Sequence, residues 1–174
     1  MFTTRTYMQR EFAAPNENIC IGSAQFGIKA TAFLGVVCMD KGMSYYELFP
    51  RSVNKERFWE FLKHLKSKHG HGKLILYLDN LSCHKNVETR KLYHKLDIVP
   101  VFAPVYSPEL NPIEYVFAML KKHVKQMRLS DMIRQEKRTF DDLVPIAVDK
   151  LNVQDINHCI GHVYKRYNLK LTNS

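Results

Sequence analysis

A short and almost wholly apolar run at residues 73–79, KLILYLD, constrains the fold of this chain more than any other feature of its sequence. A run of this length and composition, preceded by Gly72 and followed by Asn80, is typical of a strand whose two faces are both buried. Burial on both faces is found mainly in sheets that carry helices on either side. The run therefore predicts an α/β fold that is built around this strand.

The residues before this run predict a hairpin and a helix. Residues 29–39 and 43–49 are rich in β-favouring side chains, and the Asp-Lys-Gly sequence at 40–42 between them predicts a turn. The sequence Ser-Val-Asn at 52–54 then predicts the start of a helix. Its apolar residues recur at helical spacing, namely Phe58, Phe61, Leu62 and Leu65.

The remaining elements alternate and complete the sheet. The pattern predicts a helix at about 85–96, a strand at 98–102, and helices at 112–128, 140–150 and 153–166. Residues 1–12 are interpreted as a strand remnant and residues 13–28 as a loop, and three prolines within 103–112 argue against regular structure there. This order predicts one α/β domain over the 174 residues, with a mixed sheet flanked by helices and with active groups at the carboxyl ends of its strands.

The charge balance indicates the class of partner. The chain has 26 Lys and Arg against 17 Asp and Glu, which gives a net charge of +9. A basic excess of this size favours polyanions, because lysine and arginine release counterions from phosphates. We therefore expect a nucleic-acid partner.

Several classes of protein are excluded by the same sequence. The cysteines Cys20, Cys38, Cys83 and Cys159 have no Cys-x-x-Cys spacing, which argues against a zinc ribbon or a disulfide scaffold and favours reduced thiols. No apolar run approaches the roughly 20 residues that span a bilayer, and the polar first ten residues do not resemble a secretory signal. We expect a soluble protein with no membrane partner that is not secreted, nuclear in a eukaryote and cytoplasmic otherwise.

Asp79 is the first candidate for a functional acid. It follows the apolar run directly, where a carboxylate is costly unless it is paired, hydrogen-bonded or bound to a metal. The alternative is that Asp79-Asn80 begins a turn and caps the next helix. The residues alone leave both interpretations open.

Glu114 is the second candidate, and it too has a structural alternative. In Asn111-Pro112-Ile113-Glu114, asparagine stands at a helix N-cap, proline at the first helical position and glutamate at the third. This is the pattern of a capping box, in which the glutamate side chain binds a backbone N–H group. Taken alone, Glu114 fits capping better than catalysis.

The surroundings of the two acids resemble a known family. Asp79-Asn80 is followed by His84, Glu114 ends the segment YSPELNPIE at 106–114, and 34 residues separate the two acids. These features resemble the mariner-type superfamily of DDE transposases, including its bacterial insertion-sequence relatives. DKGMSYYELF at 40–49, followed by SVN and FWEFL, also resembles the second and third strands and the first helix of that family's RNase H-like fold.

The resemblance implies that Asp79 and Glu114 are the second and third acids of a metal-binding triad. Two Mg²⁺ or Mn²⁺ ions would be expected in a complete site, about 3.5–4 Å apart, where they serve an in-line phosphoryl displacement. The first aspartate would bridge both ions.

The first aspartate has no counterpart in this sequence. In relatives it lies on the first strand, in an Asp-Glu pair just before a segment like MFTTRTYMQREF, so we expect it a few residues before Met1 and the first strand to be truncated. Asp40 is the only acid between Glu17 and Glu47, and it is predicted to lie at the hairpin turn. Activity as an enzyme is therefore expected to need an upstream aspartate.

Further residues are candidates for support or for DNA contact. Asn80 either orients Asp79 or forms the turn, and His84 either supports the site or binds backbone at a helix start. Tyr106 either contacts DNA or packs in its loop. Lys121 and Lys122 belong to a basic set with Lys125 and Arg128, part of which is expected to face DNA.

Two functions follow as hypotheses. The first is a transposase catalytic domain that cleaves and transfers DNA strands at transposon ends, acts on target DNA, and lacks the N-terminal helix-turn-helix domain of its relatives; a homodimer is one arrangement that it could adopt. The second is a catalytically dead remnant or domesticated DNA-binding module that keeps the fold. A different RNase H-like nuclease is disfavoured by the YSPELNPIE segment.

Overall fold

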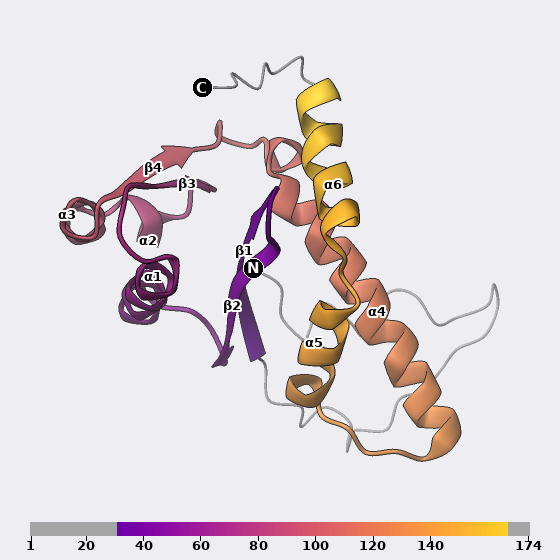
Figure 1. Ribbon diagram of the computed structural model, residues 1–174. Coiled ribbons are helices and arrows are strands. Elements are labelled where there is room, and N and C mark those ends of the chain that lie inside the picture. Colours follow the sequence, from indigo (N-terminus) through magenta and orange to yellow (C-terminus); the bar gives the residue numbers. More distant parts are fainter. Residues whose placement is uncertain (1–30, 167–174) are drawn as a thin grey trace.

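The computed structural model describes residues 31–166. A β-hairpin lies between two groups of elements (Figure 1). The elements, in chain order, are β1 (Thr31–Cys38), β2 (Gly42–Pro50), α1 (Lys55–His69), β3 (Leu74–Leu78), α2 (Ser82–Lys85), α3 (Val87–Lys95), β4 (Ile98–Phe102), the 3₁₀ helix η3 (Pro108–Leu110), α4 (Pro112–Arg134), α5 (Phe140–Asp149) and α6 (Val153–Arg166).

The hairpin buries a different set of side chains on each face. β1 and β2 are antiparallel, with a register shift between Val36 and Val37. Phe33 packs with α4, α5 and α6 in one core, and Ala32 packs with α1, β3 and β4 in the other. Successive residues of a strand point to opposite faces, so the hairpin separates the two cores. The expected hairpin is confirmed, and Asp40 lies exposed at its turn.

Helix α1 confirms the predicted apolar spacing. The Asn54 side chain accepts a hydrogen bond from the N–H of Arg57 at 3.0 Å, which caps the helix start. The helix ends at Gly70, whose φ of 77° suits glycine. All four residues predicted to face the core are buried, namely Phe58, Phe61, Leu62 and Leu65.

The apolar run at 73–79 forms a strand, but its expected burial on both faces is wrong. β3 pairs with β4 in parallel, and this pair is a separate sheet from the hairpin within residues 31–166, where one mixed sheet was expected. Leu76 is 6% exposed, whereas Ile75 is 68% exposed and Tyr77 is 41% exposed. The inner side chains of β3 and β4 pack in the core that contains α1. Apolar composition thus predicted the strand correctly but not how many of its faces are covered.

The helix expected at about 85–96 is confirmed as α3, and the short helix α2, which was not expected, precedes it and is separated from it at Asn86. The backbone of Asn86 is extended, with φ −64° and ψ 158°, and its side chain accepts a hydrogen bond from the N–H of Thr89 at 2.7 Å. Asn86 therefore ends α2 and caps α3. The Thr89 hydroxyl, which is fully buried, also donates to the carbonyl of Cys83 at 2.9 Å, so the break is held by hydrogen bonds.

Helix α4 is longer than expected and runs to Arg134 rather than to about Arg128. The extra turns are held in place by Asp131, which is 4% exposed and accepts hydrogen bonds from Nε of Arg138, at 3.1 Å to each carboxylate oxygen. A bidentate contact with arginine compensates the burial of such a charge. The helix ends at Gln135, which adopts the left-handed conformation.

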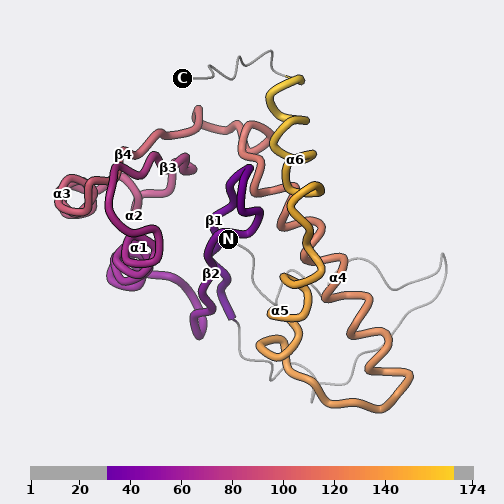
Figure 2. The backbone as a smooth tube through the Cα atoms, viewed as in Figure 1, coloured from indigo at the N-terminus to yellow at the C-terminus, as the bar shows by residue number. Residues whose placement is uncertain are grey.

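The two C-terminal helices lie where the sequence predicts them. Thr139 and Asp142 form a capping box at the start of α5. Asn152 caps the start of α6 by accepting from the N–H of Asp155 at 2.7 Å. α6 runs back along α4 in the opposite direction, so the C-terminal end of α6 lies beside the N-terminal end of α4 (Figure 2).

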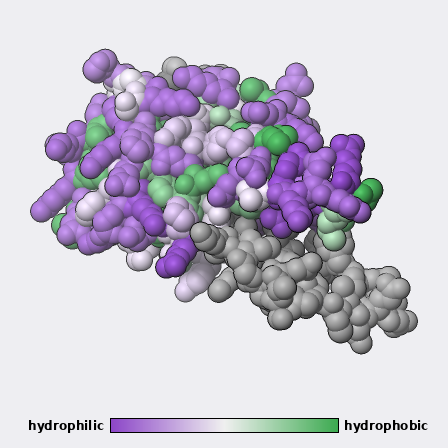
Figure 3. Space-filling model, turned by 90° about the horizontal axis from the view of Figure 1, so that it is seen from below, coloured by the Kyte–Doolittle hydropathy of each residue, from purple (hydrophilic) through white to green (hydrophobic). Residues whose placement is uncertain are grey.

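The described surface is mostly polar. Figure 3 shows hydrophilic side chains over most of one face, with apolar ones scattered between them. No helix in residues 31–166 is both long and apolar enough to cross a membrane. Cys38, Cys83 and Cys159 are free thiols, as expected, and Cys20 lies outside the described residues together with the segments 1–12 and 13–28.

Candidate active site

Asp79 lies directly after β3, at the carboxyl end of this strand. Two hydrogen bonds hold this end against the end of β4. The N–H of Ala103 donates to the carbonyl of Leu78 at 2.8 Å, and the Asn80 side-chain amide donates to the carbonyl of Ala103. Asn80 therefore ties the strand ends together and makes no hydrogen bond to Asp79 itself.

One oxygen of the Asp79 carboxylate is anchored. Oδ1 lies 2.8 Å from Nδ1 of His84 and accepts from the N–H of Leu81 at 3.3 Å. Because a carboxylate oxygen only accepts, Nδ1 of His84 must carry the proton of this bond. Oδ2 accepts no hydrogen bond from any residue in the described part of the chain, and 40% of the side chain is exposed. The carboxylate is thus held in position through Oδ1, and no described residue engages Oδ2.

His84 is itself held firmly in place. It is 7% exposed, and its ring lies 4.3 Å from the ring of Phe58 in α1, centroid to centroid. Its Nδ1 also lies 3.4 Å from the backbone carbonyl of Asp79, so the expected backbone contact is present beside the carboxylate contact. Burial excludes direct contact with DNA and makes His84 a positioning residue for Asp79. Periodicity placed Phe58 in the core, and nothing in the sequence indicated that it supports this histidine.

The surroundings of Asp79 keep its carboxyl group ionised. Burial raises the pKa of Asp79, but the hydrogen bond and charge of His84 and the hydrogen bond from Leu81 outweigh burial, so the pKa lies below its ordinary value. At neutral pH the group is therefore a carboxylate, the form that binds a cation.

Glu114 lies exposed in the first turn of α4 and does not form the capping box that its position allows. The Asn111 side chain makes no capping hydrogen bond, and the Glu114 side chain makes no hydrogen bond or ion pair with a residue of 31–166. Glu114 therefore does not cap the helix, which was the structural alternative to a role in the site. Its carboxylate is left open to solvent at the positive end of the α4 dipole.

The structure brings some of the predicted residues together and not others. Asp79 and His84 are in contact, and Asn80 braces the strand ends beside them. Glu114 has no hydrogen bond to any of these three among the described residues. No three His, Cys, Asp or Glu side chains in residues 31–166 are grouped so that they could hold a metal ion. Residues 31–166 therefore hold no complete set of metal ligands.

Tyr106 lies in the loop between β4 and α4, and it is not packed. Its side chain is 98% exposed, and its φ of 59° is uncommon for a residue with a side chain. The alternative of a packed loop aromatic is wrong for Tyr106. An exposed ring beside the helix that carries Glu114 is available for contact with a ligand.

The basic residues of α4 differ in exposure. Lys122 is exposed, whereas Lys121, Lys125 and Arg128 are partly buried. Leu120 and Val124, which the sequence places in the core, are fully buried. Lys122 is therefore the member of this set that is most open to a partner.

We expect the change of His84 to phenylalanine to weaken Mn²⁺ binding by about tenfold, because a lost supporting hydrogen bond typically costs 10- to 100-fold in metal affinity. A phenylalanine ring can still pack on Phe58 but cannot donate to Asp79. The matched control is His64→Phe, since Nδ1 of His64 lies 2.8 Å from a carboxylate oxygen of Glu47, away from the site. Isothermal titration with Mn²⁺ measures both variants, and equal affinities would refute the positioning role.

Comparisons with known proteins add the family and the fold. A family model described as DDE superfamily endonuclease matches residues 1–136. No protein of curated description matches the chain.

Solved structures of Mos1 transposase share the fold. The Mos1 catalytic domain with raltegravir and Mn has a TM-score of 0.61 and 19% identity, and the match covers 80% of this chain and 73% of that one. The catalytic domain of Mos1 mariner transposase gives 0.61 and 18%, with 80% and 72% covered. The Mos1 mariner paired end complex with Mn gives 0.63 and 18%, with 92% and 48% covered. The expected α/β, RNase H-like fold is confirmed.

Proposed function

Because this chain belongs to the DDE superfamily of endonucleases, we propose that it is the catalytic domain of a mariner-type DNA transposase. In this function the domain cleaves and transfers DNA strands at transposon ends, in the nucleus of a eukaryote or the cytoplasm of a bacterium. We propose further that residues 1–174 form a single domain. The alternative is a module that keeps the fold and DNA binding without the chemistry.

The observation that carries this proposal is the state of the two acids. Within residues 31–166, Asp79 is fixed through Oδ1 and no hydrogen bond reaches Oδ2, and Glu114 does not form the capping box that its position allows. Structural acids normally use their oxygens for caps or ion pairs within the protein. Two acids with carboxylate oxygens that no described residue engages, one at the carboxyl end of β3 and one in the first turn of α4, are what a metal-dependent nuclease of this fold needs.

The residues present fit divalent metal ions as part of a ligand set. Carboxylate oxygens are the ligands that Mg²⁺ and Mn²⁺ prefer. Asp79 and Glu114 would each supply one carboxylate to the metal site. When bound, two such ions activate water or a DNA 3′-hydroxyl and stabilise the leaving oxygen. A third acid comes, in this proposal, from outside residues 31–166, because no three-residue group is present within them.

Other residues have separate roles in the proposed site. His84 orients Asp79, and Asn80 holds the ends of β3 and β4 in register. Tyr106 and Lys122, both exposed, are placed to contact DNA as a stacking ring and a phosphate-binding charge. The partners are thus transposon-end and target DNA, and a homodimer is the assembly that two transposon ends would require.

Coupling between Mn²⁺ and DNA binding tests the proposal. If the acids hold a metal against a DNA phosphate, Mn²⁺ and DNA must each raise the affinity for the other. We expect 1 mM Mn²⁺ to tighten binding of a duplex about fivefold at constant ionic strength, which corresponds to a coupling of about 1 kcal/mol. Fluorescence anisotropy with a labelled duplex measures the effect.

The variant Glu114→Gln separates the two functions. In a DNA-binding module without a metal site, Mn²⁺ only competes for phosphates and weakens binding. Loss of the Mn²⁺-dependent gain in Glu114→Gln supports the nuclease site. A wild-type chain that binds DNA but loses affinity when Mn²⁺ is added supports the module, and a chain that binds no DNA contradicts both.

A further inference from the structure

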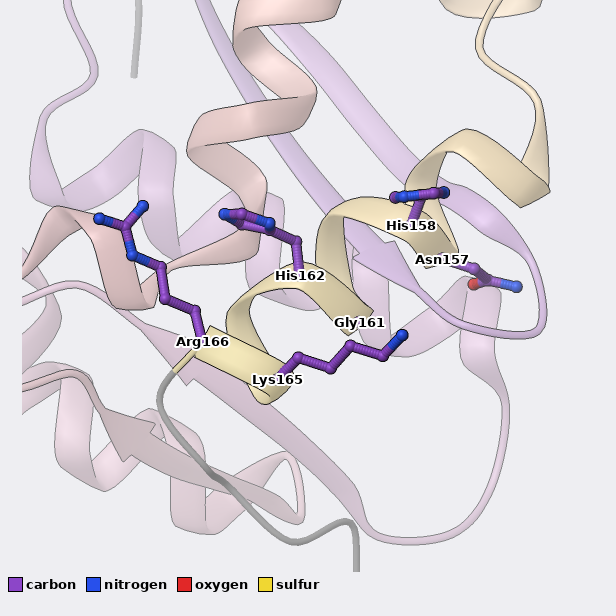
Figure 4. A pocket seen from close by; sticks show the side chains of 6 residues that line it. All are labelled: Asn157, His158, Gly161, His162, Lys165 and Arg166. Atoms are coloured by element: carbon purple, nitrogen blue, oxygen red, sulfur yellow. The ribbon is translucent and has the colours of Figure 1, made fainter.

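The outer side of α6 carries a shallow hollow that the two acids do not explain. It has a volume of about 480 Å³ and is lined by Asn157, His158, Gly161, His162, Lys165 and Arg166 (Figure 4). No Asp or Glu lies in this lining. Gly161 keeps the centre open, since a Cβ there would meet no atom within 4 Å. The hollow is therefore a concave surface whose charged side chains, Lys165 and Arg166, are both basic.

The C-terminal half of α6 lies beside the helix that carries Glu114. The ring of His162 meets the ring of Tyr115 edge to face, with 5.3 Å between centroids, and Tyr115 directly follows Glu114. The last turns of α6 thus adjoin the segment that bears Glu114.

The stability of α6 does not explain the residues on its outer face. Ile156, Ile160 and Val163 are buried on the inner side of α6. His158, His162 and Lys165 recur at spacings of four and three, which places them together on the outer side. The helix dipole favours Lys165 in the last turn, but its effect falls off within one turn and does not account for His158 or His162. The nearby acid of α6, Asp155, accepts from the Asn152 amide at 2.7 Å and stands outside the hollow.

We propose that the outer face of α6, formed by His158, His162 and Lys165, binds the phosphate backbone of DNA and aligns the strand beside Glu114. This inference rests on the proposed function. The lysine ammonium supplies a charge and the imidazole N–H groups supply hydrogen bonds to phosphate oxygens. Contacts of this kind carry no base specificity, so the face positions DNA of any sequence.

Salt-dependent binding of DNA tests the face. In the triple variant His158→Gln, His162→Gln, Lys165→Gln, we expect binding of a 30-base-pair duplex of arbitrary sequence to weaken about tenfold at 50 mM NaCl. The slope of log K against log salt concentration should fall by about 1, because one charged contact with a phosphate is lost. Fluorescence anisotropy between 50 and 200 mM NaCl measures both quantities.

A matched control removes the same side chains elsewhere. Lys63, His71 and His94 are exposed on the side of the hairpin that carries α1 and α3, away from α6 (Figure 1). The triple variant Lys63→Gln, His71→Gln, His94→Gln should lose much less affinity for DNA. Its slope of log K against log salt concentration should stay closer to that of the wild type. Equal losses in the two triple variants, or no loss in the α6 variant, would overturn the inference.

Two further readouts separate this inference from folding and from the proposed function. Lys165→Gln alone changes one exposed side chain and should still lower the slope by about 1; an unchanged slope overturns the inference even if the triple variant does not fold. Mn²⁺ affinity without DNA should match that of the wild type in both α6 variants. Retained Mn²⁺–DNA coupling with an unchanged slope would refute the α6 face and leave the proposed function standing.

Discussion

Mn²⁺ binding is expected to weaken by at least about tenfold when Asp79 is replaced by asparagine, and its coupling to DNA binding is expected to disappear. Asparagine keeps the shape of the side chain and an acceptor oxygen for His84 and the N–H of Leu81. It replaces the open Oδ2 by an NH₂ group, which only donates and cannot bind a cation. The loss of a direct ligand should exceed the tenfold loss expected from removal of its His84 partner.

The control for this change is Asp40→Asn. Asp40 is an exposed carboxylate at the turn between β1 and β2, so its replacement removes the same charge from the molecule without touching the site. Electron paramagnetic resonance of free Mn²⁺ gives the affinities, and far-ultraviolet circular dichroism verifies folding. Unchanged Mn²⁺ affinity in Asp79→Asn would show that Asp79 is a turn residue after all.

Stability is expected to fall by about 2–5 kcal/mol in Leu120→Ala, the range typical of a large apolar residue lost from a core. Leu120 is fully buried in the middle of α4, and it belongs to the core that joins α4 to α5, α6 and the hairpin. The buried side chains of this core come mainly from β1, α4, α5 and α6, so they cannot collapse freely into the space that alanine leaves. Part of the cost is the cavity itself.

Urea denaturation measures this loss. The matched control is Lys122→Ala, two residues along the same helix, where the side chain is exposed and the expected change is within about 0.5 kcal/mol. Alanine also has the higher helix propensity, so neither change weakens α4 through its backbone. A loss below about 1 kcal/mol in Leu120→Ala would mean that α4 is not held by this core.

The sequence by itself determined the order of the elements and the position of both acids along them. The hairpin, α1, α5 and α6 were predictable because turn residues, caps and apolar spacing act over a few neighbouring residues. Asp79 was predicted at the end of β3 and Glu114 at the start of α4 for the same reason. The resemblance to DDE transposases was also visible in short segments around these two residues.

Local sequence patterns gave incomplete or wrong predictions where tertiary contacts decide the structure. The apolar run of β3 predicted burial on both faces, although Ile75 and Tyr77 are exposed. The helix expected at 85–96 is present as α3, but the pattern did not show α2 or the break at Asn86, which is held by hydrogen bonds from the N–H and the buried hydroxyl of Thr89. The length of α4 depended on Arg138, which compensates the buried Asp131 from beyond the helix end.

Only the tertiary structure decided how the acids are used. The sequence allowed Asp79 to be a turn and Glu114 a cap, and the same residues could have formed either arrangement. His84 packed on Phe58 anchors one oxygen of Asp79, and the missing cap bond leaves Glu114 open. The contact of His162 with Tyr115 brings α6, from far along the chain, beside the helix turn that carries Glu114. Such contacts join residues that no local pattern relates, because packing and burial depend on the whole fold.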